Sequence, residues 1–146
     1  MIKPGILSIS GVVLAGMLVG LGSCKKPGGG EAASNMGIGP IKEQLKLAAV
    51  DDAMAGEGKK LFEDKCSACH KIGERYVGPD LAHVTHRRQP EWIMNMILNP
   101  GEMTQKDPQA QELLAQFATQ MTFQNVSQDE ARKILELFRK NDSGGK

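Results

Sequence analysis

The residues best suited to chemistry in this sequence are five consecutive ones, Cys66, Ser67, Ala68, Cys69 and His70. The spacing C-x-x-C-H is that of a covalent attachment site for a c-type haem. Each thiol can add to a vinyl group of one porphyrin, and the histidine that follows can offer a ring nitrogen to the iron. The sequence therefore predicts one covalently bound haem c, attached through Cys66 and Cys69, with His70 as an axial ligand of the iron.

Three other interpretations of this motif have requirements that the sequence does not meet well. A thioredoxin-like dithiol needs a βαβ context, whereas the residues around Cys66 are typical of helices. A structural zinc site needs four ligands, and no second C-x-x-C pair exists to complete a tetrahedron. A chance match would leave two exposed thiols open to oxidation. Haem attachment remains the leading interpretation.

The residues after position 50 are expected to form an all-α domain of four or so helices that positions this motif. No alternating strand pattern of useful length appears there, and the last helix has apolar residues at the helical period. The first helix is expected to run through the haem cysteines, and the second to end at Asn99-Pro100. Residues 41–50 fit either an extended arm or a helical lead-in. The expected helix starts are Asp51 or Asp52, Pro90, Pro108 after Asp107, and the capping box Ser127 to Glu130.

Residues 51–140 resemble class I cytochromes c. The resemblance rests on the segment Gly58 to Phe62 before the haem motif, on Gly78-Pro79, and on a methionine shortly before a C-terminal helix. It implies a class I cytochrome c fold in a domain of residues 51–146, with the first and last helices crossing closely at Gly58 against Ile134 or Leu135. It also implies that the Pro79 carbonyl accepts a hydrogen bond from Nδ1 of His70, which would fix the tautomer of the ligand.

The sixth iron ligand has to be chosen among several candidates. Met103 and Met121 are both expected in loops, which can present a thioether to an iron. Met121 lies six residues before Ser127, which matches the ligand loop of the family, although Thr122 stands where the family usually has proline. We therefore expect Met121 as the second axial ligand, with Met103, His83 and His86 as the alternatives.

Three further residues are candidates for the edge of the haem. Arg87, Arg88 and Trp92 carry forked guanidinium groups and an indole N–H, which are suitable donors to the two haem propionates. The competing interpretation is a charged approach to a helix with a tryptophan that packs in the core.

Residues 1–23 have the pattern of a bacterial lipoprotein signal peptide. Lys3 precedes an apolar run from Ile6 to Leu21 that is short for a membrane span, and the run ends in Leu21-Gly22-Ser23-Cys24, which resembles a lipobox. The resemblance implies cleavage before Cys24 and acylation of that cysteine, while an ordinary signal peptide or an uncleaved anchor remain alternatives. Residues 24–50 are then a lipidated flexible tether and lead-in arm. We expect an exported protein, lipid-anchored to a bacterial membrane and facing the periplasm.

The composition of the chain agrees with a small exported carrier. Its 18 basic and 17 acidic residues leave a formal charge of +1, which gives no reason to expect binding to nucleic acid. Aromatic residues make up only 4% of the chain, so we expect the haem to complete the core of a single domain and the haem-free protein to be poorly folded.

Histidine and methionine ligands together would leave the iron no open position, which favours outer-sphere transfer of single electrons over catalysis. The expected partners are a quinol-oxidising complex as donor and a terminal reductase or oxidase as acceptor. The stretches Arg75 to Pro79 and Pro90 to Pro100 are similar to lipoprotein cytochromes c associated with nitrous-oxide reductases. The alternatives are a haem enzyme or gas-binding protein with an open sixth site, and a fixed redox subunit of a membrane complex.

Overall fold

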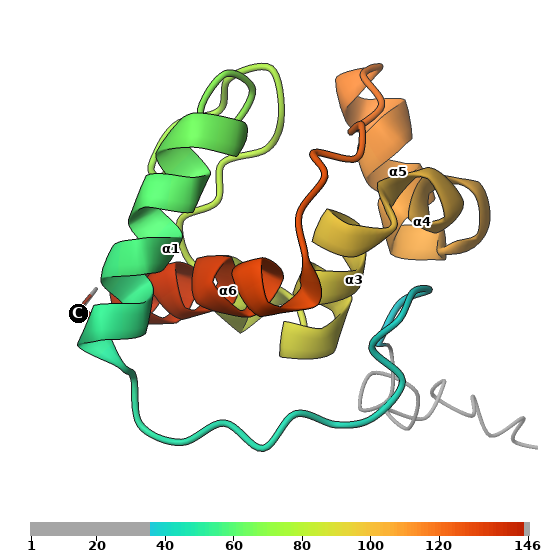
Figure 1. Ribbon diagram of the computed structural model, residues 1–146. Helices are drawn as coiled ribbons and strands as arrows, with labels where there is room; N and C mark the ends of the chain where they lie inside the picture. The colour runs from blue at the N-terminus through green and yellow to red at the C-terminus, as the bar shows by residue number, and fades with distance from the viewer. Residues whose placement is uncertain (1–35, 145–146) are drawn as a thin grey trace, which may run out of the picture. The chain divides into compact units, whose positions relative to one another are not determined.

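Two helices far apart in the sequence, α1 (Asp52–Lys65) and α6 (Gln128–Ser143), cross at Gly58 in the computed structural model (Figure 1). A Cβ atom at Gly58 would overlap the carbonyl group of Lys133 and lie 3.1 Å from the backbone nitrogen of Ile134. Glycine is required because any side chain would hold the two helices apart. The structure describes residues 36–144, so the predicted signal peptide and Cys24 lie outside the described residues.

The described residues form six helices and no strand, which confirms the all-α prediction. Two of the helices, α2 (Val84–Arg87) and α4 (Pro100–Lys106), were not expected. α2 has only four residues and shows no periodicity, and α4 begins at the proline that was expected to end the helix before it. α1 ends at Lys65, so the prediction that it runs through the haem cysteines is wrong. The four helices between α1 and α6 are α2 (Val84–Arg87), α3 (Pro90–Leu98), α4 (Pro100–Lys106) and α5 (Pro108–Phe117).

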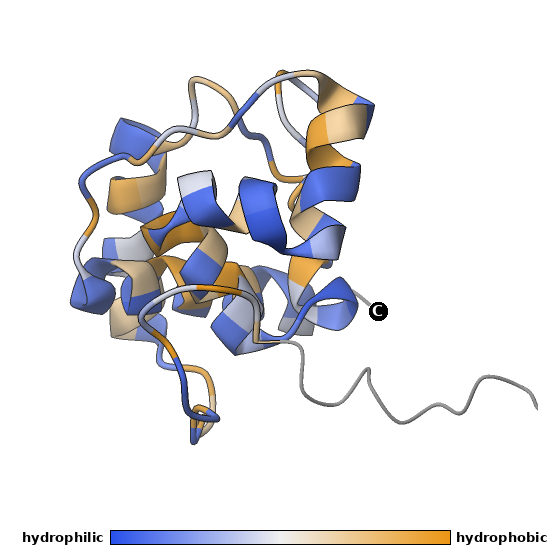
Figure 2. Ribbon diagram, turned by 90° about the vertical axis from the view of Figure 1, so that its right-hand side faces the viewer, coloured by the Kyte–Doolittle hydropathy of each residue, from blue (hydrophilic) through white to orange (hydrophobic). Residues whose placement is uncertain are grey.

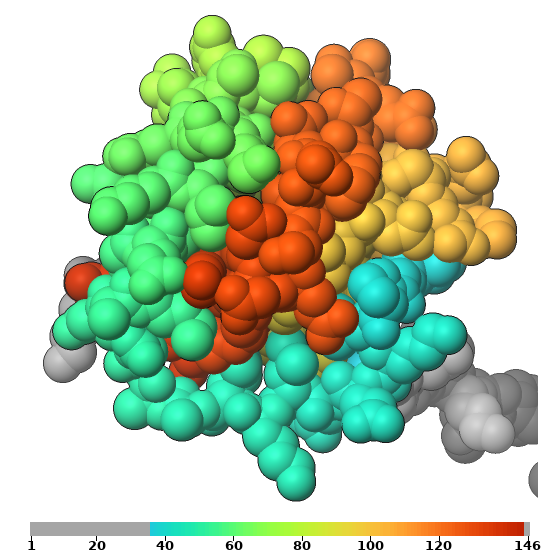
Figure 3. All heavy atoms as spheres, in the orientation of Figure 1, coloured from blue at the N-terminus to red at the C-terminus, as the bar shows by residue number. Residues whose placement is uncertain are grey.

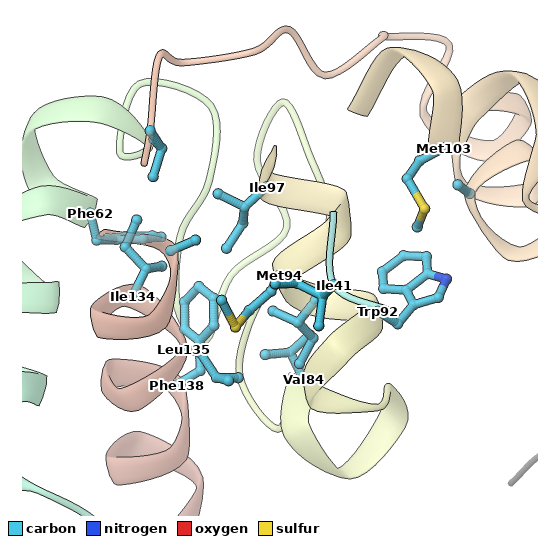
Figure 4. Packing of buried hydrophobic residues seen from close by; sticks show 14 residues of the cluster. Ile41, Phe62, Val84, Trp92, Met94, Ile97, Met103, Ile134, Leu135 and Phe138 are labelled. Atoms are coloured by element: carbon cyan, nitrogen blue, oxygen red, sulfur yellow. The ribbon is translucent and has the colours of Figure 1, made fainter. Parts of the chain in front are cut away.

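The hydrophobic core lies between α1, α3 and α6 (Figure 4). Phe62 of α1 meets Phe138 of α6 edge to face, with ring centroids 5.9 Å apart. Met94 of α3 is buried beside Leu135 of α6. Apolar and polar residues share each helix (Figure 2), as expected where one face is packed and the other meets water. None of the helices in residues 36–144 is long and apolar enough to cross a bilayer.

Residues 36–50, which we call the strap, contain no helix and cross the lower side of the molecule in Figure 3, so the open question about residues 41–50 is settled in favour of a non-helical arm. The Asn95 side chain accepts a hydrogen bond from the Ile41 N–H at 2.9 Å and donates to the carbonyl groups of Ile41 and Met36 at 2.9 and 2.7 Å. The Leu45 N–H donates to Glu91 at 2.6 Å. The strap is therefore bound to α3 ahead of residue 51, where the domain was expected to start.

Glu136 of α6 holds the start of α1 in place. Its carboxylate is fully buried, accepts a hydrogen bond from the Asp51 N–H at 2.8 Å, and pairs with Arg132 and Arg139. Burial alone would raise its pKa, but the Asp51 N–H and the two guanidinium groups outweigh burial and hold the pKa below its ordinary value. Arg139 also donates to the Ala48 carbonyl at 2.6 Å, so one ion cluster joins α1, α6 and the strap.

Asp142, near the end of α6, caps the short helix α2. Its buried carboxylate accepts hydrogen bonds from the backbone N–H of His83 at 2.7 Å, and from the backbone N–H and hydroxyl of Thr85 at 2.9 and 2.6 Å. His83 adopts a left-handed conformation with φ of 56° and supplies no side-chain cap of its own. A carboxylate from a distant helix therefore satisfies the donors that α2 leaves unpaired.

We expect Gly58→Ala to destabilise the haem-loaded protein by about 3 kcal/mol, because the added methyl group overlaps the backbone of α6. Gly56→Ala is the matched control on the same helix, since a Cβ there meets nothing within 4 Å. That change should stabilise the protein by about 0.5–1 kcal/mol. Guanidinium unfolding followed by circular dichroism measures both, and equal stability of the two variants would contradict the prediction.

Candidate functional site

The haem motif occupies a tight turn directly after α1. The Cys66 N–H donates to the Phe62 carbonyl at 2.9 Å, and the N–H groups of Cys69 and His70 donate to the Cys66 carbonyl at 3.1 and 2.9 Å. This folding brings both thiols and the imidazole to the wall of one cavity of about 400 Å³. Burial raises the pKa of the Cys66 thiol to about 11, although the Lys65 ammonium lowers it, so the free thiol is neutral at pH 7.

His70 lines the cavity and packs against Gly78 and Pro79 of the loop that follows it. Nδ1 lies 3.4 Å from the Pro79 carbonyl oxygen, the partner that the family resemblance implies. A Cβ atom at Gly78 would overlap the ring and lie 2.7 Å from Nδ1. Burial lowers the pKa of His70, while the contact with Pro79 raises it. The net effect favours the neutral imidazole, which is the form that binds a metal.

Among the candidate sixth ligands, Met121 lies in the wall of the cavity, on the segment between α5 and α6. Met103 does not line the cavity. It belongs to helix α4 and not to a loop as expected, it is fully buried, and its sulfur accepts the Ile38 N–H at 2.9 Å. In Figure 4 its side chain points toward the indole ring of Trp92. The structure thus brings Met121, and not Met103, to the cavity that contains His70.

The two other histidines lie outside the cavity wall. His83 and His86 are both exposed, and their rings stack on each other with centroids 5.7 Å apart. Met96 of α3 is a second thioether that lines the cavity, whereas its neighbour Met94 is buried in the core. The sequence analysis did not identify Met96 as a residue of the site.

Arg87, Arg88 and Trp92 all line the cavity, but their polar groups have protein partners. The Trp92 indole N–H donates to the buried Asp107 at 3.0 Å, so in this structure it is not directed to a propionate. Arg87 donates to the carbonyl groups of Ala82 and Asp80. The guanidinium of Arg88 lies 5.1 Å from the centre of the Trp92 ring. The single N–H of the indole is thus occupied, whereas each guanidinium has five N–H donors, so the prediction of propionate contacts now concerns Arg87 and Arg88 alone.

Most of the cavity wall is apolar, which suits a flat hydrophobic porphyrin. The two thiols lie beside the imidazole, and the Met121 thioether is carried by a separate segment of the cavity wall. These are the groups that a covalently held haem with two protein ligands needs. The apolar wall comes from all helices except α4, and includes Phe62, Val84, Ile93, Ile97, Leu113, Phe117, Ile134 and Phe138.

Residues 55–141 match the cytochrome c family. The chain belongs to this family. A cytochrome c carries covalently bound haem c, and the family consists mostly of electron carriers rather than enzymes. The haem motif, Gly58 and Gly78-Pro79 are the parts of this cytochrome c that sequence reasoning located in advance. The contact of Asp107 with the Trp92 indole and the packing of Gly78 on the His70 ring were missed because each joins residues that are not neighbours in the sequence.

Solved structures agree with this assignment. The cytochrome c from Rhodothermus marinus is 40% identical with a TM-score of 0.72, over 78% of this chain and 97% of that one. An engineered form of it, Rma TDE, is 38% identical with a TM-score of 0.70, over 77% and 96% of the two chains. The cytochrome c domain of the pp3183 protein from Pseudomonas putida is 27% identical with a TM-score of 0.55, over 59% and 88%. No curated protein matches the sequence.

We expect Gly78→Ala to displace the His70 ring and to destabilise the haem-loaded protein by about 1–3 kcal/mol, the usual cost of overpacking. Gly101→Ala in α4 is the control, because a Cβ there meets nothing within 4 Å. Guanidinium unfolding and the visible spectrum of the reduced protein measure the effect. A Gly78→Ala protein with the spectrum and unfolding midpoint of the parent would show that the ring does not depend on this contact.

Proposed function

We propose that this cytochrome c is a membrane-tethered carrier of single electrons, with His70 and Met121 as the axial ligands of one haem c. The placement of Met121 in the wall of the cavity that contains His70 carries the proposal, since it offers the iron two protein ligands. Haem c, when bound, supplies an iron that changes between the ferrous and ferric states. A soft thioether favours the ferrous state and raises the reduction potential relative to two histidines.

The protein's own residues then hold and shield the haem. Cys66 and Cys69 hold it covalently, and His70, oriented by Gly78 and Pro79, binds the iron. The apolar wall of the cavity excludes water, so little solvent reorganises when the charge on the iron changes. These roles describe outer-sphere electron transfer, in which no substrate needs to reach the metal.

The surface beside the cavity suits brief contact with redox partners. The exposed large apolar side chains in the described residues are Tyr76, Val77 and Phe123, at 53%, 40% and 53% exposure. Val77 lines the cavity, and Phe123 follows Met121 by two residues. Small apolar patches of this kind fit the limited interfaces of redox encounters. We infer a quinol-oxidising complex as donor and a terminal reductase, such as nitrous-oxide reductase, or an oxidase as acceptor.

The enzyme and gas-binding alternatives require an open sixth position on the iron. Carbon monoxide binding to the reduced protein at neutral pH would support them and would argue against ligation by Met121. A complex that survives purification in detergent would instead favour a fixed redox subunit over a mobile carrier. Both measurements use the full chain loaded with haem.

The ligand assignment is tested by comparing Met121→Ala with Met103→Ala. We expect Met121→Ala to abolish the weak methionine-to-iron band of the ferric protein at the red end of the visible spectrum. Met103→Ala should keep that band but reduce the free energy of unfolding by about 2–5 kcal/mol, because it empties a fully buried site. Loss of the band in Met103→Ala alone would overturn the assignment.

Membrane attachment through Cys24 is tested by Cys24→Ser, expressed in a bacterium that processes lipoproteins and matures c-type cytochromes. We expect the parent to incorporate labelled palmitate and the variant to incorporate none, while the haem spectrum of the variant stays unchanged, because the thiol that is acylated is lost and Cys24 lies before the described domain. A variant that still incorporated the label would show that another residue is acylated.

A further inference from the structure

One side-chain contact joins the loop that carries the haem motif to the helix that precedes Met121. The guanidinium carbon of Arg75 lies 4.4 Å from the centre of the Phe117 ring, within the range of a cation–π interaction. Arg75 is exposed and belongs to the loop between His70 and Pro79, while Phe117 is the last residue of α5 and lines the cavity. The contact therefore connects two parts of the cavity wall that are remote in sequence.

Phe117 directly precedes the segment that carries Met121. Ala118, the next residue, has a φ of 51°, and Asn125 near the other end has a φ of 53°, so two non-glycine residues in the left-handed region flank the methionine. From residue 119 to residue 125 the described structure has one hydrogen bond to another element, from the Gln120 side chain to the Thr104 hydroxyl at 3.4 Å. A segment with so few contacts opens at low cost.

We propose that the Arg75–Phe117 contact is a latch that holds the Met121 segment closed over the haem, which makes Arg75 a positioning residue for the sixth ligand. The proposal rests on the ligation of iron by Met121 argued above. Arg75 itself touches neither the iron nor its ligand. It acts on Phe117, whose position sets where the chain turns at Ala118 and hence where Met121 is presented.

The latch has a measurable consequence because an external ligand binds the ferric iron only after Met121 has left it. The apparent dissociation constant of such a ligand is its intrinsic value divided by the fraction of open protein. An exposed cation–π contact contributes about 0.5–1 kcal/mol, so its loss raises the open fraction about two- to fivefold. The apparent affinity should rise by the same factor.

The experiment is a titration of the ferric, haem-loaded protein with imidazole at a pH of about 8, where the probe is neutral and insensitive to the lost charge of Arg75. We expect Arg75→Ala to bind imidazole about two- to fivefold more tightly than the parent. Arg75→Lys retains a cation for the ring and should restore most of the parent affinity. The control is Tyr76→Leu, which removes the other cation–π contact of this loop, with Lys71 at 5.2 Å, and should leave the affinity unchanged.

A double-mutant cycle separates the latch from general loosening of the fold. Phe117→Leu keeps the cavity wall apolar but removes the aromatic ring. In the Arg75→Ala background it should cause no further gain in imidazole affinity through the latch, so that the two changes are non-additive. Additive effects, an Arg75→Ala protein with the parent affinity, or an equal gain in Tyr76→Leu would each overturn the proposal. In the Met121→Ala background, Arg75→Ala should have no effect on the affinity for imidazole. In a parent protein that shows the methionine-to-iron band, the contradicting results would overturn the latch alone, whereas a parent without the band would overturn the ligand assignment and the latch with it.

Discussion

The close approach of α1 and α6 at Gly58 is the constraint on which the rest of the structure depends. Backbone meets backbone there, with the Lys133 carbonyl at the place that a side chain of residue 58 would occupy. The crossing sets Phe62 against Phe138 and thereby fixes the end of α1, from which the turn of Cys66 to His70 starts. A small change in the helix crossing would therefore move both thiols relative to the opposite cavity wall.

Helix α3 has two packed faces, one toward the cavity and one toward the strap. Trp92, Ile93, Met96 and Ile97 line the cavity, whereas Glu91, Asn95 and Asn99, each four residues apart, bind the strap through their side chains. The backbone of the strap has no sheet partner, so these polar side chains satisfy it. Asp107 links α3 to α5, since its carboxylate accepts the Trp92 N–H and caps α5 through the Ala110 N–H.

Two buried carboxylates on α6, Glu136 and Asp142, bind neighbouring elements of the domain. Burial raises the pKa of each, but hydrogen bonds, and for Glu136 also two arginines, lower it further than burial raises it, and both carboxyl groups remain charged in the folded state. Their stabilising effect is present above the unfolded pKa and is lost as the pH falls through the lowered folded value. The two carboxylates connect α6 with the start of α1 and with α2, so the walls of the haem cavity depend on them.

The sequence by itself determined the features that depend on local spacing. The haem motif needs only neighbouring residues, and the capping box at Ser127 and the prolines at the starts of α3 and α5 act within one turn. The position of Met121 before Ser127 favoured it as the ligand, but only the tertiary structure places Met121 in the cavity wall and Met103 against the strap. It also decided that the Trp92 N–H serves Asp107, that Asp142 caps α2 and that the strap is not helical. Each of these outcomes follows from a buried polar group finding a partner far along the chain, which no local pattern specifies.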